Sequence, residues 1–465
     1  MIKNFSSKVL SLILFLFLFY LIANLFYIKN QKFKNFINNN YPKIKKTIFA
    51  TPAILDQEKE YMKNLDNKKM KPSYIERNIK STQFLDFSEN KYPLNSYNYK
   101  SNRMKAVGFI DFHKDNLFFI SGTGEVKFIK EKKFSNFEND AINIKTNIKD
   151  IIKDNSFFDT STKILSQFNS ISDVLIYKGY IYLSFNRLVR ENCYTKSIIR
   201  SKIDFEYLEF KDFFYNKNEC RTFSSDKRKF NGHQSGGRMV IIDSNSIYNF
   251  FNKESDKILF TVGDYRSNRS EEIPLAQSEK SIFGKTLLID IKSDEYKIFS
   301  KGHRNPQGLF YDKNDQIIIS TEHGPYGGDE INILNFGKNY GWPLSSYGEN
   351  YLRTKADKIK DFYFEKNHSN FGFEEPLIAF TKSIGISEII KVSENFHYKW
   401  KDSYLATSLN GHVILRFNLN DKKNKIQTIE LINVGERVRD IKFQKRKIYV
   451  VLENSATIGV YSILE

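Results

Sequence analysis

Hydrophobic positions recur in a strand, turn, strand pattern along most of the chain after about residue 105. Six such units can be recognised, and they begin at residues 107, 173, 238, 308, 387 and 439. In each unit, an apolar stretch such as VGFIDF is followed by a short polar turn and a second apolar stretch. The starts are separated by about 50 to 80 residues, which is too long for one hairpin and suits a four-stranded sheet with its loops.

This repetition favours one fold class over another. A β-sandwich does not explain why the same pattern returns along the whole chain, whereas radial repetition of one sheet does. The pattern therefore predicts an all-β fold, a six-bladed β-propeller over residues 101–465. Helices should be a minor component, because few stretches after residue 100 keep a 3.6-residue apolar period. Loops that leave the inner strands of a propeller meet around its central channel, so polar groups at the strand ends are expected to converge there.

The beginning of the chain has a different pattern. The stretch from Val9 to Ile28 contains 20 residues and no charge, enough for a helix of about 30 Å that crosses a bilayer. We expect an uncleaved transmembrane anchor, because large side chains stand where a signal peptide has small ones. Residues 1–8 are then a cytoplasmic N-terminus and residues 29–100, rich in Lys, Asn and Asp, a polar linker. Lysines flank both ends of the apolar stretch, so the positive-inside rule discriminates poorly between the two orientations.

Charge and cysteine content refine this picture. The net charge is +18, but 8 lysines precede the first acid, Asp56, which leaves 18 − 8 = +10 for the remainder. No arginine-rich helix accompanies these lysines, so a solvated surface, with anionic lipid near the N-terminus, is favoured over nucleic acid. The two cysteines, Cys193 and Cys220, lie in polar segments. In an exported domain they can form a disulfide; two unpaired thiols are the alternative.

A histidine and an aspartate flank two strands of the third unit. His233 precedes a strand in HQSGGRMVIID, and Gly236 and Gly237 permit close backbone approach there. This histidine is a candidate general base, although a loop histidine is more often an ordinary hydrogen-bonded residue. Asp264, in TVGDYRSN, follows the next strand and is placed to orient an imidazole. A simple turn aspartate is the alternative.

Arginines stand at two other strand starts. Arg304 and Asn305 precede Pro306, which holds Asn305 in an extended conformation. A guanidinium there can clamp a carboxylate or a phosphate. Arg437 and Arg439, in ERVRDI, share one face of a strand, where two cations repel each other unless an anion joins them. Exposure on a sheet edge is the alternative.

The segment EHGPYGGDEIN offers oxygen ligands. The backbone carbonyls of Gly324 and Pro325 suit a hard cation such as calcium. Asp329 and Glu330 follow and would suit the same cation or balance nearby arginines. The same pattern is also typical of a tight turn.

Several of these motifs occur together in one known family. The series HQSGGRMV, GHRNPQGL, EHGPYGGDEIN, GKNYGWP, YGENY and ERVRDI resembles the glucose/sorbosone dehydrogenases, the soluble sugar dehydrogenases that use pyrroloquinoline quinone (PQQ). The resemblance covers about residues 225 to 455, is densest between 302 and 348, and implies a six-bladed propeller.

The resemblance also implies roles for the residues above. His233 is similar to the base that takes the substrate hydroxyl proton, with Asp264 beside it. Calcium would polarise the quinone carbonyl that accepts the hydride. The positions that would hold PQQ and calcium are Arg304, Asn305, Arg437 and Arg439 for the quinone, Gly324 and Pro325 for calcium, and Asp329 close by.

Three positions depart from the family pattern. Asn410 follows Ser408 and Leu409 where a lysine is expected, which removes a cation near the quinone. His323 replaces a glutamine beside the calcium-binding carbonyls, and Phe168 or Asn169 stands where the second blade is expected to carry a glutamine. His323 and Asn410 are still expected to face the quinone.

Three functions remain open at this point. The first is a membrane-anchored quinoprotein sugar dehydrogenase that faces the periplasm from the inner membrane, with an aldose as substrate and an electron acceptor that the sequence does not identify. The second is a related propeller that has lost its cofactor and acts as a binding module. The third is a calcium-dependent hydrolase of the lactonase type, which would act without an electron acceptor.

Overall fold

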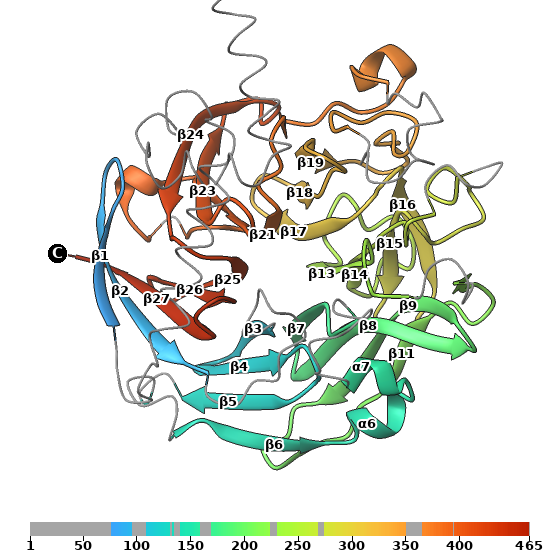
Figure 1. Cartoon of the computed structure of the whole chain (residues 1–465), viewed down its shortest axis with the longest axis horizontal. Coiled ribbons are helices and arrows are strands. Elements are labelled where there is room, and N and C mark those ends of the chain that lie inside the picture. Colours follow the sequence, from blue (N-terminus) through green and yellow to red (C-terminus); the bar gives the residue numbers. More distant parts are fainter. Residues whose placement is uncertain are drawn as a thin grey trace, which may run out of the picture. The chain divides into compact units, whose positions relative to one another are not determined.

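Six β-sheets are arranged around one axis like the blades of a propeller (Figure 1). The computed structural model describes residues 76–94, 108–130, 133, 140–158, 169–223, 230–267, 274–349, 365–393 and 395–464. The chain divides into two compact units, and all of the described residues belong to the second, Pro72–Glu465. The expected six-bladed, all-β fold is confirmed. Among these residues no helix is both long enough and apolar enough to cross a bilayer, and the expected anchor at 9–28 lies outside them.

The innermost strand of each blade begins within two residues of a start predicted from the hydrophobic pattern. Each of these strands contacts the innermost strands of both neighbouring blades, so that together they form a closed ring. In the order of blades 1 to 6, they are β3 (Gly108–His113), β7 (Asp173–Tyr177), β13 (Gly236–Ile242), β17 (Pro306–Asp312), β21 (Ile386–Lys391) and β25 (Val438–Gln444).

The outer strands follow in nearly sequential order, and all pairs are antiparallel except β6 with β10. Blade 1 adds β4 (Asn116–Ser121), β5 (Val126–Lys130), β6 (Ile142–Thr146) and β10 (Tyr207–Leu208). Blade 2 adds β8 (Tyr180–Arg190), β9 (Cys193–Lys202), β11 (Lys211–Tyr215) and β12 (Arg221–Thr222). Blade 3 adds β14 (Lys257–Val262), β15 (Lys285–Asp290) and β16 (Tyr296–Lys301). Blade 4 adds β18 (Ile317–Glu322), β19 (Asp329–Leu334) and β20 (Ile378–Phe380). Blade 5 adds β22 (Tyr404–Ser408), β23 (Val413–Leu419) and β24 (Ile426–Asn433). The described residues also contain four short helical turns: α6 (Ile148–Ile151), α7 (Asn155–Phe158), η3 (His368–Phe371) and η4 (Tyr398–Trp400).

Apolar side chains fill the spaces between adjacent blades. Six clusters of buried residues each draw on two neighbouring sheets, as Phe118 of blade 1 and Leu183 of blade 2 do in one of them. Both faces of a blade are therefore covered, which explains the near-continuous apolar strands of the sequence. In β14 all six residues are buried.

Blade 6 is assembled from the two ends of the propeller. Its strands β25, β26 (Lys447–Leu452) and β27 (Thr457–Ile463) come from the end of the chain, and β2 (Asp86–Pro93) and β1 (Glu76–Ser81) complete it. Because β2 pairs with β27 through main-chain hydrogen bonds, the ring is closed. The prediction that residues 29–100 form a polar linker is therefore wrong for 76–93.

The error has a physical cause in the composition of β2. The strand contains Glu89, an acid that normally indicates exposure, yet this side chain is buried. Its carboxylate accepts a hydrogen bond from the Tyr461 hydroxyl at 2.7 Å and lies 3.8 Å from the Lys80 ammonium. The partner of β2 comes from the far end of the chain, so local sequence gave no sign of pairing.

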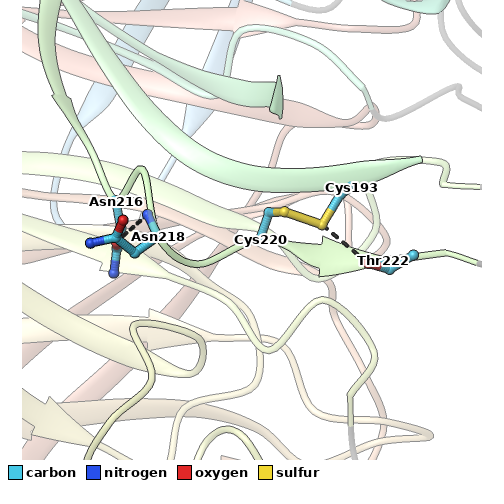
Figure 2. The surroundings of a disulfide bond; sticks show 5 residues. All are labelled: Cys193, Asn216, Asn218, Cys220 and Thr222. Carbon is cyan, nitrogen blue, oxygen red and sulfur yellow. Dashed lines mark hydrogen bonds between the residues drawn. A yellow bond between two sulfur atoms is a disulfide. The ribbon is translucent and has the colours of Figure 1, made fainter. Parts of the chain in front are cut away.

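A disulfide joins Cys193 and Cys220, which lie 27 residues apart (Figure 2). Cys193 begins β9, and Cys220 immediately precedes the short strand β12, which pairs with β9. The alternative of two unpaired thiols is excluded. In the chain-entropy model, closing a loop of this length stabilises the fold by about 3 kcal/mol, and such bonds persist in oxidising compartments.

Candidate active site

A pocket of about 280 Å³ lies at one end of the ring of inner strands. Its walls are segments that lead into the inner strands of blades 2 to 6, together with Phe109 of blade 1 and the turns that follow β18 and β22. Six residues predicted from the sequence line this one pocket, although they are spread over more than 200 positions. They are His233, Asn305, His323, Asn410, Arg437 and Arg439.

A buried glutamate holds the two arginines of blade 6 together. The Glu453 carboxylate accepts from Arg437 Nε at 2.7 Å and from Arg439 Nε at 2.6 Å. Burial opposes ionisation of Glu453, but the two guanidiniums hold its pKa below the usual value. The expected repulsion between the arginines is thus relieved by the protein itself, and the group of three keeps one net positive charge toward the pocket.

Arg304 lies beside this pocket without lining it. Its Nη1 donates to the backbone carbonyls of His323 at 2.9 Å and Gly324 at 2.6 Å, and its guanidinium lies over the Trp342 ring at 5.3 Å. Arg304 and His323 also line a second cavity of about 20 Å³, about the space of one water molecule. The structure therefore places two of the three predicted arginines in the pocket wall, with Arg304 supporting the wall from behind.

Asp264 is buried next to the segment that carries His233. One carboxylate oxygen accepts from the Trp342 indole N–H at 2.7 Å, and the other accepts from the Arg266 backbone N–H at 2.9 Å. The Gln234 amide, oriented to suit both neighbours, donates to Asp264 at 2.8 Å and accepts from Arg304 Nη2 at 2.7 Å. These contacts hold Gln234, the residue that follows His233, whereas orientation of the imidazole itself by Asp264 stays a prediction.

The carbonyls predicted to bind calcium lie in the turn after β18. Among the residues that the structure describes, only Arg304 donates to the Gly324 carbonyl oxygen, which leaves its second lone pair for another partner. Asp329 is engaged differently, because its carboxylate accepts from the backbone N–H groups of Gly324 and Gly385 and from the Ser383 hydroxyl. The chemistry of this site fits a cation held by carbonyls, with Asp329 shaping the turn.

His323 presents an unsatisfied nitrogen. Its Nε2 is buried and has no hydrogen-bond partner among the described residues. Burial lowers the pKa of this imidazole, against the opposing effect of Asp329, so the neutral ring is favoured. A buried polar atom without a partner on a pocket wall is typical of a site that receives a polar ligand.

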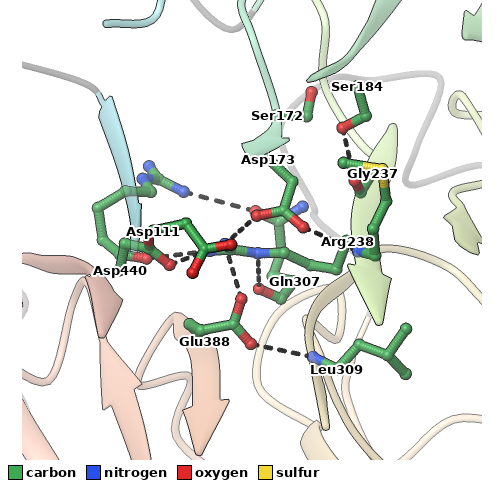
Figure 3. A network of polar contacts seen from close by, with 12 residues as sticks. Asp111, Ser172, Asp173, Ser184, Gly237, Arg238, Gln307, Leu309, Glu388 and Asp440 are labelled. Atoms are coloured by element: carbon green, nitrogen blue, oxygen red, sulfur yellow. Dashed lines mark hydrogen bonds and ion pairs between the residues drawn. The ribbon is translucent and has the colours of Figure 1, made fainter. Parts of the chain in front are cut away.

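Below the pocket, Arg238 occupies the centre of the ring (Figure 3). Its Nη1 lies 3.1 Å from Asp173, 2.7 Å from Glu388 and 2.9 Å from Asp440. Burial raises the pKa of Asp173 to about 7, although Arg238 opposes this. Three carboxylates this close are also compatible with a metal ion, but the guanidinium already occupies the space between them.

Sequence reasoning missed several residues of this region. Glu453 follows a run of five apolar residues, which was a usable signal for a buried acid. Arg238 lies within the motif HQSGGRMV, but no spacing to other charged residues marked it as part of the site. Ser172, Ser235 and Gln307 line the pocket without any pattern that marks them.

The fold and the pocket define a propeller with a cationic axial site, and comparison with known proteins identifies its family. Residues 176–460 match the model of the Glucose / Sorbosone dehydrogenase family, and the chain belongs to this family. It is 32% identical over 146 residues to the aldose sugar dehydrogenase YliI of Escherichia coli, which is 31% of this chain and 38% of that protein. It is 30% identical over 162 residues to quinoprotein glucose dehydrogenase B of Acinetobacter calcoaceticus, which is 28% of this chain and 31% of that protein. The chain spans about a third of the length of the curated relatives it matches.

Solved structures agree on the fold. The apo form of the soluble E. coli aldose sugar dehydrogenase has a TM-score of 0.57 at 19% identity and aligns over 80% of this chain and 99% of that structure. The PQQ-bound aldose sugar dehydrogenase of Streptomyces coelicolor has a TM-score of 0.51 at 16% identity, over 81% of this chain and 98% of that structure. At these identities the likeness concerns the fold alone.

Proposed function

We propose that the chain is an aldose dehydrogenase that uses PQQ bound in the axial pocket. The observation that carries the proposal is the meeting of Arg437, Arg439, His233 and His323 in one pocket. A planar polycarboxylate needs cations and hydrogen-bond donors on its rim. Two guanidiniums and a buried nitrogen without a partner suit such a ligand. Relatives of this chain carry the names of aldose sugar dehydrogenase and quinoprotein glucose dehydrogenase.

The residues of the pocket divide the work between binding and proton transfer. Arg437 and Arg439 would hold carboxylates of the cofactor, and Asn305 and Asn410 offer amide groups nearby. His233 would take the proton of the sugar hydroxyl on an imidazole nitrogen. The quinone, when bound, supplies the acceptor for the hydride of the sugar. The Gly324 and Pro325 carbonyls would hold calcium, a Lewis acid that polarises an acceptor carbonyl.

A cofactor-free binding module is the second candidate. The observation in its favour is Asn410, which offers no charge and donates instead to the Ser383 carbonyl at 3.0 Å. Quinone titration distinguishes the two, because only the dehydrogenase is expected to bind PQQ and to reduce an artificial acceptor when an aldose is added.

The first prediction concerns Arg437. In the Arg437→Gln variant, PQQ should bind about 10- to 100-fold more weakly, because one charge-assisted hydrogen bond to a carboxylate is lost. Glu453 keeps Arg439 as its partner, so folding should be retained. Calorimetric titration of the full chain with PQQ and calcium measures the change. The control is Arg416→Gln, which removes a guanidinium paired with Glu430 in blade 5, away from the pocket; equal effects in the two variants would contradict the assignment.

We also propose that residues 9–28 tether the propeller to the inner membrane with the catalytic domain in the periplasm. The 20 uncharged residues and the Cys193–Cys220 disulfide support this. The full chain should stay with membranes after alkaline extraction, and protease added to cells with a permeable outer membrane should cleave the propeller. Recovery in the soluble fraction, or protection from the protease, would contradict this location.

A further inference from the structure

A lysine is buried directly behind the pocket wall. Lys196 of β9 is fully buried, and its ammonium donates to Ser172 Oγ at 2.6 Å, Asn186 Oδ1 at 3.2 Å and Ser235 Oγ at 3.4 Å. Ser172 and Ser235 both line the pocket. The lysine therefore reaches the pocket through two hydroxyl groups that belong to different blades.

When Lys196 is protonated, the direction of these hydrogen bonds is fixed by chemistry. An ammonium group only donates, so both serine hydroxyls act as acceptors toward Lys196. Each hydroxyl hydrogen is then available for another acceptor. That of Ser172 has a long contact of 3.3 Å to the Ser170 carbonyl, a weak bond that a better acceptor in the pocket can replace.

The charge of Lys196 has no carboxylate in contact with it among the described residues. Burial lowers its pKa well below the usual value, and Asp173 opposes this from a longer distance. Asn186 Oδ1 is shared with the hydroxyl of Tyr265, which donates at 2.6 Å. By contrast, the buried Lys257 lies 3.2 Å from Asp290. An anion in the pocket would supply the compensation that Lys196 lacks.

The space for this arrangement depends on Gly237. Its φ is +122°, and a Cβ there would lie 2.5 Å from Ser172 Cβ and 2.7 Å from Lys196 Cε. Any larger residue would push the lysine away from the serine. The close approach is therefore a feature of the local backbone as well as of the side chains.

We propose that Lys196, Ser172 and Ser235 form a donor relay that recognises an anionic oxygen of the ligand in the axial pocket. Lys196 acts as a positioning residue, since it touches the ligand only through the serines. The inference rests on the proposed function, in which that ligand is a quinone polycarboxylate. An anion bound at the serines stabilises the ammonium form, so binding should be accompanied by proton uptake at Lys196.

Calorimetric titration of the full chain with PQQ and calcium, between about pH 6.5 and about pH 8.5 and in buffers of different ionisation enthalpy, tests this. Lys196→Met should bind about 10-fold more weakly at the lower pH. The wild-type affinity should fall as pH rises, because less ammonium is then present, and this fall and the proton uptake should be smaller in the variant. The matched control is Lys285→Met, which removes another fully buried lysine, held by the carbonyls of Leu275, Ala276 and Phe283. It should lower stability without changing proton uptake.

Two further outcomes keep the test decisive. If Lys196→Met does not fold, the Ser172→Ala/Ser235→Ala double variant replaces it, and this variant should also bind about 10-fold more weakly. Wild-type affinity and unchanged proton uptake in either variant would overturn the relay while leaving the dehydrogenase proposal intact. Failure of the wild-type chain to bind PQQ would overturn both.

Discussion

Replacing Arg238 with alanine is expected to destabilise the propeller by about 3–5 kcal/mol, the usual cost of removing one partner from a buried ionic group. The guanidinium is the shared partner of Asp173, Glu388 and Asp440. Without it, three carboxylates remain in a site that excludes water. Urea denaturation of the full chain measures the change, and Lys445→Ala, which removes an exposed pair with Asp115, should cost at most about 1 kcal/mol.

The loss of stability in the Arg238→Ala variant should increase as the pH rises. Burial raises the pKa of Glu388, and raises that of Asp173 to about 7, although Arg238 lowers both. Removing Arg238 should raise both pKa values further. A carboxyl group whose pKa is higher in the folded state contributes stability below its unfolded pKa and loses it as pH rises through its folded pKa. The deficit of Arg238→Ala should therefore be larger at about pH 8 than at about pH 5. A deficit that does not vary with pH would indicate lost packing instead.

The same network explains how the six blades are held in register. Four acids of the inner strands accept hydrogen bonds from backbone N–H groups of a neighbouring inner strand. The pairs are Asp111 with Ile176, Asp173 with Met239, Glu388 with Leu309 and Asp440 with Ile110. Arg238 adds donors to the carbonyls of Gln307 and Arg439. Polar contacts therefore tie the blades together at the axis, where apolar packing between sheets ends.

The sequence was sufficient for the repeating part of the fold and for six residues of the pocket wall. The three innermost strands of each blade follow one another in the chain, and both faces of the sheet are covered, so their apolar pattern is visible without knowledge of distant partners. The starts of all six inner strands could be predicted for this reason. The pocket residues stand at the ends of the same strands, and ring geometry alone brings them together.

Features that depend on distant partners could not be predicted in this way. Strand β2 looks polar because it contains Glu89. Composition does not reveal that this carboxylate is paired with Tyr461 and lies near Lys80 in the folded protein. Lys196 and Glu453 are charged residues that pack inside, against the general preference of charges for water. Their partners come from other blades or other strands, and only the assembled ring shows that these charges surround one cavity.

Replacing His233 with alanine should have the largest effect on turnover. A positioned general base accelerates proton transfer by about 10²- to 10⁴-fold, so aldose oxidation by the His233→Ala variant, loaded with PQQ and calcium, should fall by about that factor. The quinone affinity should change little, because Arg437 and Arg439 stay held by Glu453. Steady-state assays with an artificial acceptor, combined with calorimetric titration, separate the two effects.

A histidine outside the pocket, His113, serves as the control for this experiment. His113 ends inner strand β3, whereas Phe109, near the start of that strand, lines the pocket. His113→Ala should therefore leave turnover unchanged. Added imidazole should restore part of the activity of His233→Ala, since the pocket has a volume of about 280 Å³ and the missing group is a small base. Turnover close to wild type in His233→Ala, or a loss explained fully by weaker quinone binding, would show that another group takes the hydroxyl proton.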